Sequence, residues 1–99
     1  MSEKQTLHIV SKSPHGSQAL ARCLAALGEH DGILLIEDGV YGLTALMESG
    51  KQAPVSVLKP DMQARGLLSE NLDGDTVELI DYQQFVSLCA DYQKSVSWF

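Results

Sequence analysis

Short apolar runs alternate with segments of helical periodicity along this chain, and no internal repeat or low-complexity linker interrupts them. Four runs have the length and residue types of β-strands, at positions 6–11, 32–36, 55–58 and 76–80. The run 32–36 is apolar without a break, which is typical of a central parallel strand covered on both faces. The pattern therefore predicts a sheet with this segment in its interior.

The segments that follow the first two strands predict helices. A first helix is expected after a loop in which Ser13 or Ser17 could cap it, and it runs to about Leu27, where Gly28 closes it. Asp38 follows the second strand and is well placed to cap a second helix. Both helices then lie between successive strands.

Two more helical segments follow the third and fourth strands. A short helical turn is expected from Pro60, ended by Gly66. Asp81 begins the clearest helix of the chain, because Gln84 stands three positions later, as in a capping box with Asp in the Ser/Thr place. The last helix therefore has the strongest start signal in the sequence.

Alternating strands and helices indicate an α/β fold, here a small three-layer α/β/α domain with a mainly parallel sheet of four to five strands. We expect residues 1–99 to form one domain. Two good helices, one moderate helix and one short turn are few elements to cover both faces of such a sheet. A face or an edge is therefore expected to remain for a neighbouring protein.

Composition and charge narrow the possible partners. The chain is 44% hydrophobic and 20% charged, as ordinary globular proteins are, and its formal net charge is −6. Its 7 Lys and Arg residues are scattered, which argues against a direct grip on nucleic-acid phosphates. The N-terminal residues lack the apolar stretch of a secretory signal, and no run approaches the length of a membrane span. We expect a cytoplasmic protein.

The sequence carries none of the common catalytic motifs. GxGxxG, GxxxxGK[ST] and GxSxG are all absent, and the first strand does not end in the acidic residues of a phospho-receiver domain. His8 is interpreted as a satisfied strand residue, and helix capping explains Asp38 and Asp81. We expect no cofactor and no independent enzymatic activity.

The two cysteines, Cys23 and Cys89, are far apart in the sequence. Neither belongs to a CxxC pair or has a paired histidine nearby, so no metal site is expected. A disulfide between them is disfavoured in a reducing compartment. Both are expected to be free thiols.

Several segments in their order resemble the TusB/DsrH family. They are the start 7–14 (LHIVSKSP), the turn 37–40 (EDGV), the stretch 61–66 with its Ala-Arg-Gly end, the segment 81–88, and the terminal Trp98. The likeness covers nearly the whole chain, although no single motif is decisive.

The resemblance implies a DsrE-like fold and a place in a sulfur-relay complex. Members of this family assemble with TusC/DsrF-like and TusD/DsrE-like subunits as a hexamer of two heterotrimers. In the TusB branch, the complex passes persulfide sulfur from a TusA-like donor towards a TusE-like acceptor and finally to 2-thiouridine at the tRNA wobble position. In the DsrH branch, the same assembly serves sulfur oxidation.

Within such a relay the open chemical question is Cys23. A carrier needs an accessible thiolate that attacks a persulfide sulfur. The resemblance places Cys23 where DsrH-type members carry a cysteine, and the main sulfur-accepting cysteine lies on the TusD/DsrE-like partner. The helical spacing puts Cys23 on the flank of the stripe formed by Leu20, Leu24 and Leu27. Packing and a possible persulfide-carrier role both stay open.

Cys89 stands among apolar neighbours and is expected to pack. Trp98 and Phe99 form an aromatic tail that could fold back on the core or, as the resemblance favours, contact a partner subunit. Three hypotheses remain: a relay subunit with Cys23 as accessory carrier, the same subunit as pure scaffold, and an unrelated small-ligand module with a flavodoxin-like sheet.

Overall fold

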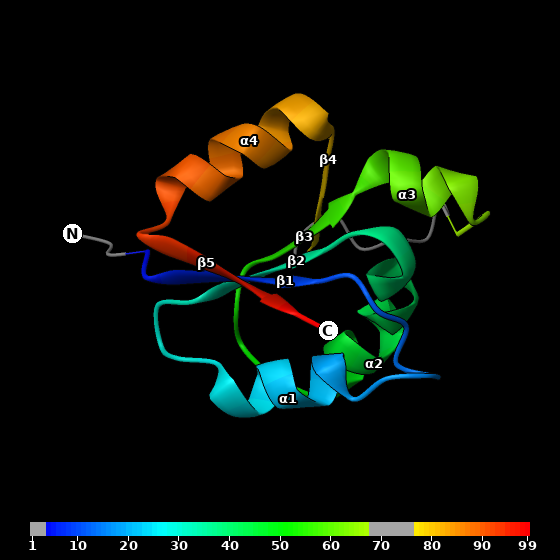
Figure 1. Ribbon diagram of the computed structural model, residues 1–99, viewed down its shortest axis with the longest axis horizontal. Helices are drawn as coiled ribbons and strands as arrows, with labels where there is room; N and C mark the ends of the chain where they lie inside the picture. Colours follow the sequence, from blue (N-terminus) through cyan, green and yellow to red (C-terminus); the bar gives the residue numbers. More distant parts are fainter. Residues whose placement is uncertain (1–3, 68–76) are drawn as a thin grey trace.

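The computed structural model describes residues 4–67 and 77–99, which form an all-parallel sheet with helices on both faces (Figure 1). The expected α/β fold with a mainly parallel sheet is confirmed, and its strand order is β4-β3-β2-β1-β5. The strands are β1 (Thr6–Val10), β2 (Gly32–Leu35), β3 (Val55–Leu58), β4 (Val77–Ile80) and β5 (Lys94–Trp98). Position 76 of the expected fourth strand lies outside the described residues.

The connections explain how the helices are distributed. From β1 to β4 each strand is laid beside the previous one, whereas β5 returns across the sheet to pair with β1. Crossovers between parallel strands are right-handed, so a connection that runs from β1 towards β4 and one that runs back from β4 to β5 place their helices on opposite faces of the sheet. Figure 1 shows α1 and α2 on one face of the sheet and α4 on the other. The helical elements are α1 (Ala19–Ala26), the 3-10 helix η1 (Glu37–Gly42), α2 (Leu43–Glu48), α3 (Lys59–Ala64) and α4 (Tyr82–Asp91).

Strand β5 is the element that the residue pattern did not locate. Thr6 lies opposite Lys94 and Val10 opposite Trp98, so β5 pairs with β1 along its whole length. Its residues Lys-Ser-Val-Ser-Trp contain one aliphatic side chain, which gives a weak strand signal. The pairing with β1, and not local hydrophobicity, makes this segment a strand.

Two hydrophobic clusters fill the space between the sheet and its helices. Alternate residues of one strand point to opposite faces, so Ile33 and Leu35 of β2 join the α1 cluster and Leu34 joins the α4 cluster. Helix α1 buries Ala19, Leu20 and Cys23, whereas none of the 10 residues of α4 is fully buried. The sheet residues are buried on both faces, with Leu34 at 0% exposure under α4, but α4 itself is less deeply buried than α1.

The predicted helix ends are partly confirmed. Asp81 forms the expected capping box with Gln84, and Gly66 follows α3 with a φ of 66°. The prediction that Asp38 caps a helix is wrong. Asp38 lies inside η1, makes no capping bond and pairs with Arg65 instead. Helix α1 has Gln18 at its N-cap position without a side-chain bond, but Ser17 Oγ accepts the N–H of Ala19 at 3.0 Å, so the expected serine does bind the start of the helix. The capping box was identifiable because both of its partners are close in sequence.

Candidate functional site

The residues singled out in the sequence do not meet in one catalytic site. Cys23 lies between α1 and the sheet, and Cys89 packs against the cluster on the opposite face. Both are free thiols, as expected. Trp98 is half-buried at the end of β5, and Phe99 is 77% exposed. The described residues contain no group of three or more His, Cys, Asp or Glu side chains placed to hold a metal.

Cys23 is fully buried, with a relative exposure of 0%. Burial, and secondly the negative charge of Asp31, raise the pKa of its thiol from 9.0 to about 11. A thiol in this environment stays protonated at neutral pH and cannot be reached by a persulfide. The surroundings of Cys23 therefore favour the packing alternative.

The predicted position of Cys23 on the flank of the apolar stripe is wrong. Ala19, Leu20 and Cys23 form the buried side of α1, while Leu24 and Leu27 are only half-buried. Helix α1 lies over β1 and the edge strand β5, and Leu24 and Leu27 pack against the buried cluster there as partly buried residues. The helical wheel gives the apolar residues but not the direction of the sheet.

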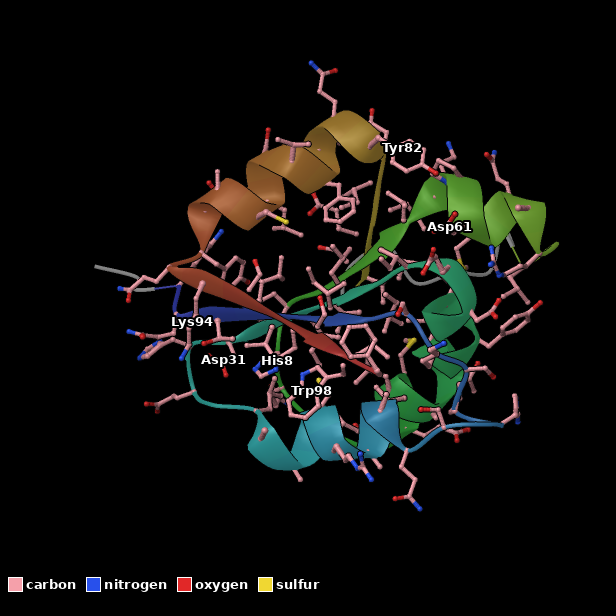
Figure 2. All side chains as sticks on the ribbon, viewed as in Figure 1. His8, Asp31, Asp61, Tyr82, Lys94 and Trp98 are labelled. Carbon is pink, nitrogen blue, oxygen red and sulfur yellow. The ribbon has the colours of Figure 1, made fainter. Side chains whose placement is uncertain are left out.

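Beneath α1, three side chains from distant segments form a hydrogen-bonded network. Figure 2 shows Asp31, His8 and Trp98 close together between the sheet and α1. The indole Nε1–H of Trp98 donates to Nδ1 of His8 at 3.0 Å, and His8 Nε2 lies 2.8 Å from Asp31 Oδ2. An indole nitrogen only donates, so Nδ1 must be unprotonated and Nε2–H must donate to Asp31. The network fixes the tautomer of His8.

Asp31 is the centre of this network. Its carboxylate also accepts the main-chain N–H of Thr6 at 3.2 Å and that of Gly28 at 2.8 Å. Burial acts to raise the pKa of Asp31, but the bond from His8 and the two main-chain bonds together lower it below the ordinary 3.8. An ionised Asp31 thus joins β1, the end of α1 and, through His8, the last strand.

The network is built for anchoring and not for proton transfer. Both ring nitrogens of His8 already have partners, the His8 side chain is 5% exposed, and its ring lies nearly parallel to the ring of Trp98, with centroids 5.9 Å apart. A general base needs a free nitrogen within reach of a substrate. The interpretation of His8 as a satisfied strand histidine is confirmed, but its partners, which are distant in sequence, could not be foreseen.

A second cluster lies at the carboxyl ends of β2 and β3. Glu37 has a φ of 50°, in the left-handed region that non-glycine residues seldom adopt, and its N–H donates to Asp61 Oδ2 at 2.6 Å. Arg65 Nε donates to Asp38 Oδ1 at 2.9 Å. A side chain on Gly39 would begin 2.0 Å from the Val10 carbonyl oxygen, so only glycine fits there.

This turn brings together segments that the sequence resemblance had identified separately. The stretch 37–40 packs on the end of β1 and is tied to Asp61 and Arg65 of the stretch 61–66. Backbone strain held in place by several contacts is a feature of functional sites as well as of structural corners. The bonds from Glu37 to Asp61 and from Arg65 to Asp38 hold this turn against the ends of β1 and β3.

The outer side of α4 exposes apolar groups. Tyr82 is 59% exposed and Val86 is 71% exposed, and the two lie one helical turn apart. Phe85, Leu88 and Cys89 hold the inner side of the helix on the sheet as half-buried residues. Together Tyr82 and Val86 form a small exposed apolar pair on α4. None of the helices in the described ranges has both the length and the apolar character that a membrane crossing requires.

Comparison with known proteins agrees with the fold and the resemblance. The family model described as "DsrH like protein" matches residues 12–95. The protein TusB of Pectobacterium parmentieri is 32% identical over 97 residues, which cover 93% of this chain and 99% of that protein. The TusB of Salmonella arizonae is 38% identical over 80 residues, covering 76% and 82% of the two chains.

A solved structure supports the architecture. The ychN protein from E. coli superposes with a TM-score of 0.63 at 20% identity, over 94% of this chain and 98% of that one. This likeness concerns the fold, whereas the family model and the TusB relatives extend over most of the sequence. The chain belongs to the DsrH-like family, whose TusB members are its relatives.

Proposed function

We propose that this chain is a subunit of a heteromeric, TusBCD-like sulfur-relay complex that passes persulfide sulfur towards 2-thiouridine at the tRNA wobble position. The observation that carries the proposal is the similarity to proteins named TusB over most of the chain. The complex works in the cytoplasm, with a TusA-like donor and a TusE-like acceptor. This chain itself makes no direct contact with the tRNA.

Within the assembly we assign this chain a scaffolding role. The burial of Cys23 and its raised thiol pKa support a structural role for this residue. The sulfur-accepting cysteine is assigned to the TusD/DsrE-like subunit, as the family resemblance implies. The outer side of α4, with Tyr82 and Val86, is the proposed contact with the TusC-like and TusD-like subunits in a hexamer of two heterotrimers. Phe99 and the free part of Trp98 are proposed as further interface residues.

The cellular test replaces the gene in its own host and measures 2-thiouridine in hydrolysed tRNA by mass spectrometry. Loss of the chain should abolish the modification, and wild type or Cys23→Ser should restore it. Val86→Glu places a charge on the exposed side of α4 and should restore it poorly, while Gln83→Glu on the same exposed helix serves as the charge control. Unchanged 2-thiouridine without the chain would contradict the tRNA branch.

A DsrEFH-like role in sulfur oxidation is the alternative function. The DsrH-like family model and the presence of Cys23 in the first helix favour it. In that case deletion leaves tRNA thiolation intact and impairs growth on reduced sulfur compounds. A one-sulfur adduct on Cys23 in the assembled complex, lost in Cys23→Ser and kept in Cys89→Ser, would replace the scaffold role by a carrier role.

A further inference from the structure

The outer edge of β5 presents a regular row of main-chain groups. Lys94 donates its N–H inward to the carbonyl of Gln5 at 3.1 Å. In a parallel strand the N–H and C=O of one residue point to the same edge, and successive residues alternate between edges. Val96 and Trp98 therefore bond inward to β1, whereas Ser95 and Ser97 direct their N–H and C=O groups outward.

This edge lacks the usual protection against pairing. No other described strand lies on the outer side of β5, and the strand contains no proline. Lys94 is its one charged residue, and Ser95 and Ser97 are both exposed. Natural edge strands are normally shielded by charges, prolines, bulges or a covering element. The edge is thus ready to pair with another strand.

The residue order around Val96 is self-complementary. In an antiparallel pair of two β5 strands about a twofold axis at Val96, Ser95 of one copy lies opposite Ser97 of the other. Both residues point their main-chain groups outward, so each of the two serine pairs exchanges two hydrogen bonds. Val96 then meets the Val96 of the second copy in a pair without hydrogen bonds, where side chains approach most closely.

The ends of the strand also match in this register. Lys94 lies opposite Trp98 of the second copy, and both side chains are on the α1 side of the sheet, because 94 and 98 are an even number of positions apart. An ammonium group beside an indole ring is attractive, and the two Lys94 residues stay at opposite ends of the pair. His8 holds the indole in place before association.

We propose that two copies of this chain associate through antiparallel pairing of their β5 strands, centred on Val96, to form one continuous sheet. The contact is isologous, since the same strand serves both copies and closes on itself. It goes beyond the proposed function, because it concerns the contact of this chain with itself and not with the paralogous subunits.

Cross-linking tests the register directly. In a Cys89→Ala background, Val96→Cys should form a disulfide-linked dimer under mild oxidation, in the full chain alone and in the co-expressed assembly. Ser95→Cys is the matched control, one position away and more exposed, and should not cross-link to itself, because it faces Ser97 of the second copy. Equal cross-linking of the two variants, or none in Val96→Cys, would overturn the proposal.

A second variant pair tests the main-chain bonds. Ser95→Pro removes an outward N–H without touching the bonds to β1, whereas Ser95→Ala keeps that N–H. Two lost hydrogen bonds per dimer should weaken self-association roughly thirtyfold in sedimentation equilibrium, with an unchanged circular dichroism spectrum. Identical association of the two variants would refute the β5 contact. Failure here together with normal co-purification of the paralogous subunits would leave the proposed function standing.

Discussion

The two faces of the sheet are covered in very different ways. On one face α1 buries Ala19, Leu20 and Cys23, and α2 adds Leu43 and Leu46. On the other face the longer α4 has no fully buried residue, and one helix makes the whole return from β4 to β5. Helix α4 has a complete capping box at its start but no fully buried residue, so a strong helix-start signal does not predict deep burial. Both layers cover the sheet, but α4 keeps the apolar residues Tyr82 and Val86 exposed.

The largest expected difference is between truncation of a buried side chain on α1 and truncation of an exposed side chain on α4. Leu20 is 4% exposed on α1, so Leu20→Ala should lower the free energy of unfolding by about 3 kcal/mol through lost burial and a residual cavity. Val86→Ala on α4, at 71% exposure, should change it by less than about 0.5 kcal/mol. Urea unfolding of both variants measures the difference. Equal losses would mean that Val86 on α4 is packed as closely as Leu20 on α1.

The two cysteines lie on opposite faces of the sheet and should differ in reactivity. The pKa of Cys23, about 11 against an ordinary 9.0, lowers its thiolate fraction about a hundredfold at neutral pH. Cys89 is only half-buried on the α4 side. Iodoacetamide labelling followed by mass spectrometry should modify Cys89 well before Cys23. Prior labelling of Cys23 would contradict the closed α1 face and support a carrier role.

The network under α1 should make a smaller but pH-dependent contribution. Asp31→Asn removes one of two acceptor oxygens and the negative charge, and should cost about 2 kcal/mol of unfolding free energy at neutral pH. Because the pKa of Asp31 is lowered on folding, its contribution is fully present above the ordinary 3.8 and is lost as the pH falls below that value. The difference between wild type and variant should therefore shrink on acidification. Asp91→Asn, at an exposed ion pair with Lys4, is the control and should have little effect at either pH.

The helix cap of α4 should give the smallest measurable effect. Asp81 accepts the N–H of Gln84 at 2.7 Å, so Asp81→Ala should lower the free energy of unfolding by about 1 kcal/mol. Asp38→Ala removes only an exposed ion pair with Arg65 and should change it by less than about 0.5 kcal/mol. Thermal unfolding of both variants provides the measurement. A larger loss for Asp38→Ala would show that the strained turn contributes more than the cap.

These two aspartates show how far the sequence could predict the fold. Both come soon after a strand, but Asp38 lies inside η1, whereas Asp81 stands at the N-cap of α4 and has a glutamine at the position that completes a capping box. Local signals of this kind predicted four strands and the main helices. They missed β5, because its strand character comes from pairing with a β1 that is distant in sequence.

The candidate site was less predictable for the same reason. Cys23 and His8 were identified by residue type, but burial of the thiol depends on how α1 is rotated over β1 and β5. The bonds from Trp98 to His8 and from His8 to Asp31 join residues from three distant segments. Periodicity gives the apolar face of an element, while its partners across the sheet follow from the topology.

Co-purification shows whether this chain assembles with the two paralogous subunits of a sulfur relay. The tagged chain is expressed with the TusC-like and TusD-like subunits of the same organism, and the eluted material is analysed by native mass spectrometry. We expect one species that contains all three chains in equal number, and we expect it to be lost when Val86→Glu charges the exposed side of α4. A chain that elutes without either paralogue would contradict the assignment as a relay subunit.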